Sequence, residues 1–477
     1  MEAKTLHTSE QDFAALELAA RLAADYRSEV AAAPLVKVAG YGEIHARFDG
    51  PVPETGTDAL KLIAELDAGA RDGLRGIVAP RFYAWVNGHS HLAGVAADWL
   101  TSAWGQNCAG IPMSPAGAAV EAVAARWLLE LLDLPPESSV GLVSGATIAN
   151  FVGLAAARGE LLRRQGWNVE EDGLYGAPNL RVLVGADAHN TIFSGLRYLG
   201  LGEKRVTTIA TDDLGRMKPG ALEQALKASS DPVIVIGQAG QINTGVSDPF
   251  ARIVPLVHDA GGWVHVDGAF GLWARASERH RHLLDGIELA DSMATDGHKW
   301  LQTPYDCGFT IVRHEEAHRR AMDMQASYLT RDNQDYRHPG AYVPELSRRA
   351  RGFAAWAMMR RLGRSGIARM VDDDVQIAQM LAEGLAAIPG VSVLNQPELN
   401  QFVVRFGADR GEDEGDRLTQ ATVDQIQRDG VAFMGTALWR GQWIMRVSVC
   451  SIATTPEDAR ITIDAVRSAW EAVQAAG

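Results

Sequence analysis

The chain has 477 residues, a length at which a single hydrophobic core stops growing and two or more lobes are expected. Hydrophobic residues make up 47% and charged residues 22% of the sequence, which is ordinary for a globular protein. The formal net charge of −14 argues against nucleic acid or an anionic membrane as the main partner. The three cysteines are scattered, and the amino terminus MEAKTLHTSEQDF lacks the apolar core of a signal peptide. We therefore expect a cytoplasmic protein without a disulfide framework.

The amino-terminal part, residues 1–75, is predicted to be a helical and arm segment. An amphipathic helical pattern begins after the candidate cap Ser9 and stops at Pro34, and a second one covers residues 58–69. The stretch 38–53 between them is rich in Gly and Pro and is expected to be a connecting arm. Around Pro80 the sequence changes to APRFYAWVNGHSH, which is dense in aromatic residues.

Residues 76–350 are predicted to form a large α/β domain. Short apolar runs alternate with helical patterns, and these runs are GLVSG, RVLVGA, VTTIAT, VIVIGQA, WVHVDGAF, SMAT and GFTIVR. Fully apolar strands between helices indicate a mainly parallel sheet that is covered on both faces.

Residues 351–477 are predicted to form a smaller α+β domain. A long helical region leads into this part of the chain. Its expected strands are VSVL, FVVRF, VAFM and WIMRVSV, and a helix from Pro456 closes the chain.

The motif HEEAH, from His314 to His318, matches the HExxH pattern of zinc proteases. That chemistry needs both histidines on one helix face and a further ligand. No third-ligand motif follows, and the run HEEAHRRAMD is polar. A solvated helix start is therefore favoured, and a zinc hydrolase through His314 and His318 is a distant alternative.

Three motifs at the ends of predicted strands carry more specific chemistry. SGATIAN, at 144–150, leads from a strand into a helix and offers backbone N–H groups to an anion such as phosphate. HVDGAF places Asp267 at a strand end, where ligands of open α/β sheets collect. TDGHKW places Lys299 between two apolar segments, where an unpaired cation would be costly to bury. An anion cradle, a carboxylate and a lysine together meet the needs of pyridoxal 5′-phosphate (PLP).

The motifs SGATIAN, ADAHNT, NTGVSDP, HVDGAF and DGHKW, in this order, resemble those of the group II PLP-dependent amino-acid decarboxylases, such as the aromatic-amino-acid, glutamate and tyrosine decarboxylases. The resemblance runs from about Pro80 to the carboxyl terminus. It implies the fold-type I PLP-enzyme fold, which is like that of aspartate aminotransferase. It also implies a homodimer that decarboxylates an L-amino acid to the corresponding amine and carbon dioxide.

The resemblance implies a set of cofactor-binding residues, and they are Ala146, Thr147, His189, Thr244, Asp267, Ala269, Asp296, His298 and Lys299. Lys299 would hold PLP as a Schiff base, and Asp267 would pair with its ring nitrogen. His189 would stack on one face of the ring and act in catalysis, with Ala269 on the other face. In GQINTG, at 240–245, the chain departs from the Thr-Thr of many family members, and Thr244 or Asn243 would lie near the ring.

The phosphate would be bound by the backbone of Ala146 and the hydroxyl of Thr147, with help from Asp296 and His298. The motif DYRH resembles the family's mobile loop and nominates Tyr336 as the catalytic residue that protonates the substrate after carbon dioxide leaves. Two other tyrosines compete for this role, and they are Tyr328 and Tyr342.

Other functions stay open at this point. A related PLP enzyme, namely a carbon–carbon lyase, an aldehyde-forming oxidative decarboxylase or a transaminase, would share the same cofactor residues. A non-catalytic PLP-binding protein is a further alternative.

The substrate is not readable from the sequence. The aromatic residues Phe82, Tyr83, Trp85 and Trp104 hint at a bulky substrate, although core packing explains them at least as well. Arg446 could anchor a carboxylate or pair inside the small domain. The same ambiguity applies to Arg348, Arg349 and Arg351.

Overall fold

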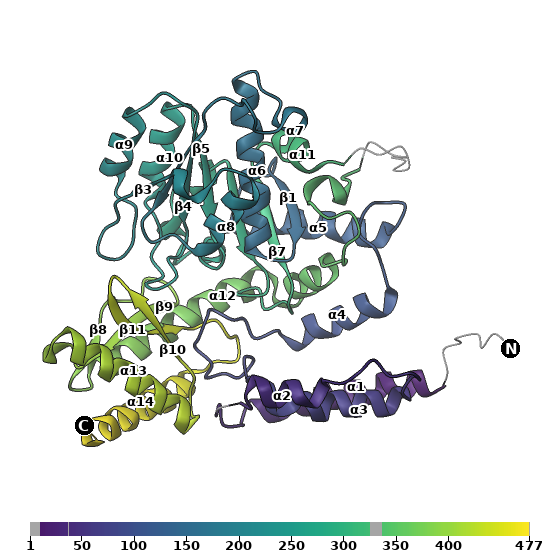
Figure 1. The fold of residues 1–477 in the computed structure, drawn as a ribbon, viewed down its shortest axis with the longest axis vertical. Helices are drawn as coiled ribbons and strands as arrows, with labels where there is room; N and C mark the ends of the chain where they lie inside the picture. The colour runs from purple at the N-terminus through teal and green to yellow at the C-terminus, as the bar shows by residue number, and fades with distance from the viewer. Residues whose placement is uncertain (1–9, 37, 325–335, 477) are drawn as a thin grey trace.

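The computed structural model describes residues 10–36, 38–324 and 336–476 (Figure 1). Helix α1 (Glu10–Val30) lies beside α3 (Ala59–Ala70) at one end of the molecule. The expected cap Ser9 lies outside the described residues. The expected arm at 38–53 contains a helix, α2 (Tyr41–Phe48), so the prediction of a plain connecting arm was wrong there. In α2, Glu43 and Arg47 are one turn apart and form an ion pair of 2.7 Å, which supports the short helix.

A seven-stranded sheet forms the centre of the molecule, with the strand order β1-β7-β6-β5-β4-β2-β3. The strands are β1 (Ser139–Val143), β2 (Arg181–Gly185), β3 (Val206–Ile209), β4 (Val233–Gln238), β5 (Trp263–Asp267), β6 (Ser292–Asp296) and β7 (Gly308–Val312). β2 to β6 pair in parallel, whereas β7 runs antiparallel to both β1 and β6. The predicted α/β fold with a mainly parallel sheet is confirmed.

Both faces of this sheet are covered, because successive side chains on each strand point to opposite faces and nearly all of them are apolar. Ile234 and Ile236 face a core built with α6 (Ala146–Arg164), α8 (Asn190–Tyr198) and α11 (Glu315–Met322). Val235, between them, faces the opposite core, and the helices there are α5 (Pro115–Leu132), α9 (Pro219–Lys227), α10 (Phe250–Asp259) and α12 (Gly352–Ala386). The sheet is therefore the rigid centre from which the loops at its edge project.

Helix α12 connects the large sheet to a second, four-stranded antiparallel sheet with the order β10-β11-β9-β8 (Figure 1). The strands are β8 (Val391–Val393), β9 (Gln401–Phe406), β10 (Gly435–Trp439) and β11 (Gln442–Ser448). Helices α13 (Glu412–Asp429) and α14 (Pro456–Ala476) pack beside this sheet. Helix α4 (Leu92–Trp104) packs against α12.

One predicted strand of this second sheet was wrong. The segment VAFM, residues 431–434, is not part of it, and only Phe433 bridges to Phe82 of the aromatic stretch. The strand lies at Gly435–Trp439 because its register is set by a tight turn into β11. The domain limits at residues 75 and 350 remain a prediction. None of the described helices combines the length and the apolar composition that a membrane crossing would require.

Candidate active site

A cavity of about 340 Å³ lies at the carboxyl-terminal edge of the large sheet. Its walls come from the segments that follow five strands, and the lining residues are Ser144, Gly145, Ala146, Thr147, His189, Thr191, Gln238, Gly240, Ile242, Asp267, Ala269, Phe270, Asp296, His298 and Lys299. Parallel strands end at the same edge, so residues far apart in the sequence meet there. All but one of the predicted cofactor-binding residues line this cavity, and the exception is Thr244.

Lys299 lies in the turn that follows β6. Its Nζ atom is 2.9 Å from Oδ2 of Asp296, and its side chain is 19% exposed. The lysine in the apolar surroundings of TDGHKW is therefore paired, because a strand-end carboxylate lies three residues before it. The turn is closely covered by Gly88, where a Cβ atom would lie 2.2 Å from the carbonyl oxygen of Lys299.

Asp296 also contacts the amino terminus of helix α6. The backbone N–H of Ala146 donates a hydrogen bond of 2.6 Å to Oδ1 of Asp296. The backbone N–H of Ala146, which was predicted to bind a phosphate, thus already has an acceptor in this structure. The remaining cradle consists of the start of a long helix and the hydroxyl groups of Ser144 and Thr147, which suit an anion.

His298 lies beside this cradle. Its Nδ1 atom accepts a hydrogen bond of 3.2 Å from the backbone N–H of Cys307, and its ring stacks on Tyr305 with 4.3 Å between centroids. Burial lowers the pKa of His298, although the charge of Asp296 raises it. The ring is therefore neutral at pH 7, with Nε2 directed toward Asp296 at 3.5 Å from Oδ1.

Asp267 is the last residue of β5 and is 6% exposed. Burial raises the pKa of Asp267, and the charges of His189 and Lys299 act in the opposite direction. The backbone N–H of Ala269 donates a hydrogen bond of 3.2 Å to Oδ1. A buried carboxylate of this kind is suited to a cation, such as a protonated ring nitrogen, because a cation would offset its desolvation.

His189 has two roles in the structure. It caps helix α8, where its Nδ1 atom accepts a hydrogen bond of 3.3 Å from the backbone N–H of Thr191 and lies 2.8 Å from that residue's hydroxyl oxygen. It also lines the cavity together with Asp267 and Ala269. Desolvation lowers the pKa of His189, the charge of Asp267 raises it, and the charge of Arg446 lowers it further.

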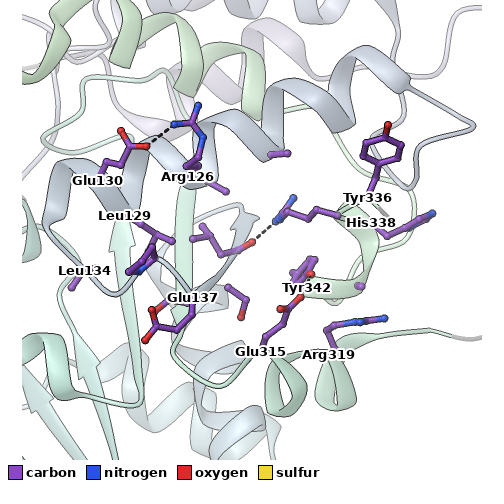
Figure 2. Close-up of a pocket in the computed structure, with 18 residues that line it drawn as sticks. Arg126, Leu129, Glu130, Leu134, Glu137, Glu315, Arg319, Tyr336, His338 and Tyr342 are labelled. Carbon is purple, nitrogen blue, oxygen red and sulfur yellow. Dashed lines mark hydrogen bonds and ion pairs between the residues drawn. The ribbon is translucent and has the colours of Figure 1, made fainter. Parts of the chain in front are cut away.

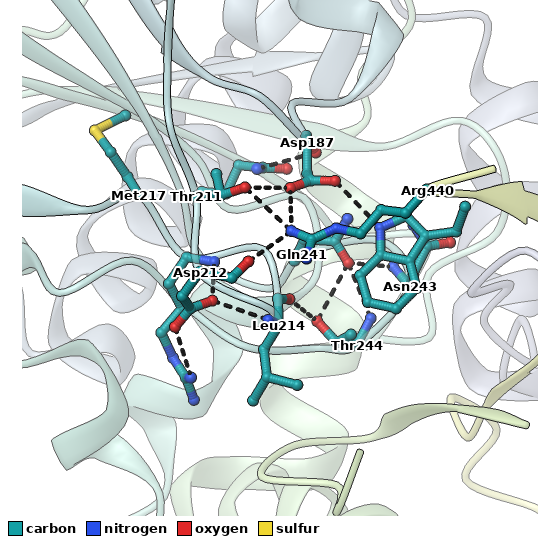
Figure 3. A network of polar contacts seen from close by, with 12 residues as sticks. Asp187, Thr211, Asp212, Leu214, Met217, Gln241, Asn243, Thr244 and Arg440 are labelled. Carbon is teal, nitrogen blue, oxygen red and sulfur yellow. Dashed lines mark hydrogen bonds and ion pairs between the residues drawn. The ribbon is translucent and has the colours of Figure 1, made fainter. Parts of the chain in front are cut away.

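Thr244 lies outside the cavity, so the structure gives no support to its predicted place near the ring. Its hydroxyl donates a hydrogen bond of 2.7 Å to the carbonyl of Leu214, and its backbone N–H donates one of 2.9 Å to Oε1 of Gln241 (Figure 3). The turn 240–245 folds around the Gln241 side chain, and this directs Thr244 away from the cavity. Ile242 of the same turn lines the cavity instead.

The predicted catalytic Tyr336 is not among the residues that line the cavity containing Lys299. Tyr336 and Tyr342 line another cavity, of about 800 Å³, between α5, β1 and α11 (Figure 2). Burial raises the pKa of Tyr342 to about 12, and its hydroxyl donates a hydrogen bond of 2.5 Å to Glu315, so it is a poor acid. Tyr328 lies outside the described residues. The role of Tyr336 stays a prediction.

The histidines of HEEAH have separate partners. His314 contacts Asp291 at 3.0 Å. His318 is fully buried and contacts Ser139 and the carbonyl of Tyr342 at 2.8 and 2.9 Å, so the expected solvated helix start was wrong for this residue. Among the described residues no group of His, Cys, Asp and Glu side chains is arranged to hold a metal ion.

The aromatic residues singled out in the sequence serve mainly in packing. Phe82 and Tyr83 are buried, and Phe82 stacks on Phe433 with 4.9 Å between ring centroids. Trp85 packs against the same pair of rings, and Trp104 packs edge-on against Phe353. None of the four lines the cavity that contains Lys299. They give no support to an aromatic substrate.

Most of the ambiguous arginines have acidic partners. Arg348 pairs with the buried Glu121, Arg349 with Asp98 and Arg351 with Asp306, at 2.7–2.8 Å. Arg446 differs: the residue is partly buried, desolvation lowers its pKa, and no described carboxylate forms an ion pair with it.

Seven residues that line the cavity were not among the predicted site residues, and they are Ser144, Gly145, Thr191, Gln238, Gly240, Ile242 and Phe270. Gln238 is the last residue of β4, so the strand-end rule that identified Asp267 could have found it. Ile242 and Phe270 lie in loops, where an apolar residue gives no signal of its own.

The fold and the cavity define a class of protein, namely an α/β enzyme with a site suited to PLP. The model of the pyridoxal-dependent decarboxylase conserved domain matches residues 42–406. The chain therefore belongs to the pyridoxal-dependent decarboxylase family, and its cofactor is PLP.

Curated relatives and solved structures agree with this family. The chain is 24% identical to an aromatic-L-amino-acid decarboxylase of Bacillus atrophaeus, over 91% of this chain and 90% of the relative. It is 28% identical to an L-2,4-diaminobutyrate decarboxylase of Rhizobium meliloti, over 87% and 83%. The structure of Oryza sativa TDC with PLP and tryptamine superposes with a TM-score of 0.91 at 22% identity, over 98% and 99% of the two chains. At that identity the structural likeness establishes the fold.

Proposed function

We propose that this chain is a PLP-dependent carboxy-lyase that converts an L-amino acid to the corresponding amine and carbon dioxide. The observation that carries the proposal is the meeting of Lys299, Asp267 and His189 in one cavity beside the amino terminus of α6. Lys299 would hold the cofactor, and Thr147 and Ser144 would bind its phosphate. The relatives include a 4-hydroxyphenylacetaldehyde synthase of Rhodiola rosea, so product analysis must separate amine from aldehyde.

Each residue of the cavity has a separate proposed role in the decarboxylation. PLP, when bound, supplies an electron sink for the bonding pair that the departing carboxylate leaves on the substrate's α-carbon. Asp267 would hold a proton at the ring nitrogen, because a buried carboxylate favours a cation beside it. His189 would fix the plane of the ring from one side. A proton must then reach the α-carbon, and Tyr336 stays the candidate from the sequence for that step.

Arg446 is proposed to bind a carboxylate of the substrate. It lies on β11, and its charge lowers the pKa of His189, which lines the cavity. A partly buried arginine without an ion-pair partner among the described side chains is suited to a carboxylate, which it can bind through two parallel hydrogen bonds. We expect Arg446→Met to raise KM for the amino acid at least about tenfold, in line with the loss of a charge-assisted hydrogen bond. An unchanged KM would exclude this role.

The Lys299→Ala variant tests the proposed function directly. It should lose the visible absorbance of bound PLP and the release of carbon dioxide from a panel of amino acids. Lys227→Ala is the control, because Lys227 is an exposed residue of α9 whose ion pair is with Glu223, one turn away on the same helix. Normal multiple turnover by the Lys299 variant would refute the proposal. The same panel, with amine, aldehyde and peroxide measured, identifies the substrate and the reaction type.

We infer further that the enzyme is a homodimer. Apolar side chains at helical spacing are exposed on the amino-terminal helices: Phe13 and Leu16 are 63% and 66% exposed, and Leu62 and Leu66 are 52% and 53% exposed. Such a face is typical of a surface that a partner covers. Replacing Phe13 and Leu62 with Ser should shift the mass measured by light scattering from dimer to monomer, whereas Tyr175→Ser should not.

A cytoplasmic location is proposed on the grounds of redox chemistry. All three cysteines are free and buried, as expected of a protein in a reducing compartment. Cell fractionation with an antibody against the chain would test this location.

A further inference from the structure

The hairpin between β10 and β11 has an unusual turn. Trp439 pairs with Gln442, so the turn consists of two residues, Arg440 and Gly441, with φ of 54° and 79°. A two-residue hairpin with positive φ at both positions strongly prefers Asn-Gly or Asp-Gly. A long side chain in the left-handed region is destabilising, so an arginine at the first position indicates a tertiary contact that compensates for it.

That contact is with Asp187, which lies in the segment that follows β2 of the large sheet (Figure 3). Nη2 of Arg440 donates hydrogen bonds to Oδ2 of Asp187 at 3.0 Å, to the hydroxyl oxygen of Thr211 at 3.1 Å and to the carbonyl of Asp212 at 2.6 Å. Nε1 of Trp439 donates to Oδ1 of the same aspartate at 3.1 Å. The whole tip of the hairpin is therefore fastened to one carboxylate, and the side chain of Asp187 is only 12% exposed.

Asp187 connects this contact to the candidate active site. It lies in the turn between β2 and α8, two residues before His189. Its backbone carbonyl accepts a hydrogen bond of 3.2 Å from the side chain of Gln238, which also lines the cavity. Arg446, the proposed substrate-binding residue, lies on β11, the strand that leaves the hairpin.

We propose that Asp187 and Arg440 are a positioning pair: they hold the β10–β11 hairpin, with Arg446, in register with the turn that carries His189. This inference rests on the proposed function, since it concerns the site in which PLP and the substrate's carboxylate meet. Lys299, Asp267 and the phosphate cradle lie on other loops, so loss of the pair should impair the use of substrate more than it weakens the binding of the cofactor, to which this turn contributes only His189.

The test is a double-mutant cycle with Arg440→Asn and Asp187→Asn, measured as kcat/KM of the PLP-loaded enzyme. Arg440→Asn creates the preferred Asn-Gly turn, so it removes the contact and keeps the hairpin. We expect each single variant to lose about tenfold in kcat/KM, chiefly through KM, and the double variant to lose no more than either one. Cofactor absorbance and the thermal midpoint of Arg440→Asn should match the wild type. Arg428→Asn is the matched control, because Arg428 is exposed on α13 and its guanidinium donates a hydrogen bond to Gln425 of the same helix.

Three outcomes would overturn the proposal. The first is wild-type kcat/KM in Arg440→Asn. The second is additive losses in the double variant, which would mean that the two residues act independently. The third is a lowered thermal midpoint with kcat/KM unchanged, which would assign the pair to stability alone. A wild-type enzyme that binds PLP and releases no carbon dioxide from any amino acid would instead refute the proposed function.

Discussion

Gly88 gives the sharpest test of how the fold places Lys299. A Cβ atom at this position would lie 2.2 Å from the carbonyl oxygen of Lys299 and 2.5 Å from that of His298. Both atoms belong to the backbone, so no side-chain rotation can relieve the overlap. The segment cannot move away freely, because the N–H groups of His89 and His91 donate to the side chain and the carbonyl of Gln302, at 2.9 and 2.8 Å.

Gly88→Ala must therefore displace the turn that carries Lys299 by about 1 Å, since side-chain carbons do not approach backbone oxygens closer than about 3 Å. Overpacking of this kind destabilises a protein by about 1–3 kcal/mol. A misplacement of about 1 Å in a reacting group costs about 10²-fold in rate. We expect Gly88→Ala to lose at least about 10²-fold in kcat and to bind PLP more weakly, on account of the same displacement.

The assay combines titration with PLP, followed by its visible absorbance, and release of carbon dioxide at saturating substrate. Gly220→Ala is the control, because a Cβ atom at Gly220 in α9 would have no neighbour within 4 Å. The control should keep wild-type activity and stability. Wild-type kcat together with wild-type PLP affinity in Gly88→Ala would refute the placement of the Lys299 turn against this glycine.

Three further predictions concern charged or titratable side chains. Asp267→Asn should reduce carbon dioxide release by at least about 10²-fold, because an amide cannot stabilise a protonated ring nitrogen as a carboxylate does; activity near the wild-type level would exclude the pairing. Glu121→Ala leaves the buried Arg348 without its partner at 2.8 Å, and we expect a loss of about 3–5 kcal/mol in the free energy of unfolding by denaturant. The hydrogen bond to Asp291 raises the pKa of His258 in the folded protein. The stabilisation that protonated His258 gives the folded state is therefore full below its unfolded pKa of about 6.5, and it is lost as the pH rises through its folded pKa. Unfolding free energies measured between pH 6 and 9 should fall in the wild type and fall less in His258→Gln. Equal slopes of unfolding free energy against pH in the two proteins would contradict this contribution of His258.

Local sequence patterns determined the large sheet and the core of the candidate site. Apolar strands between helices predicted a parallel sheet, and a parallel sheet collects the residues after its strands at one edge. Asp267 and Lys299 could be identified because Asp267 ends an apolar strand and Lys299 lies in the turn after another, where the direction of the chain leaves little choice of position. The resemblance to a family then added His189, Thr147 and their proposed roles.

Tertiary structure decided the features that depend on side-chain direction in turns and on contacts between distant segments. Thr244 donates a hydrogen bond to the carbonyl of Leu214, and Ile242 lines the cavity instead, because the turn 240–245 folds around the side chain of Gln241. His318 is buried although its surroundings in the sequence are polar.

The contact between Arg440 and Asp187 joins residues that are 253 positions apart, and neither one is distinctive in its local sequence. The period of a strand or a helix specifies which face a residue occupies, whereas a turn has no period. The local sequence therefore places Lys299 in the turn after a strand, and only the packed molecule determines which side chains surround it.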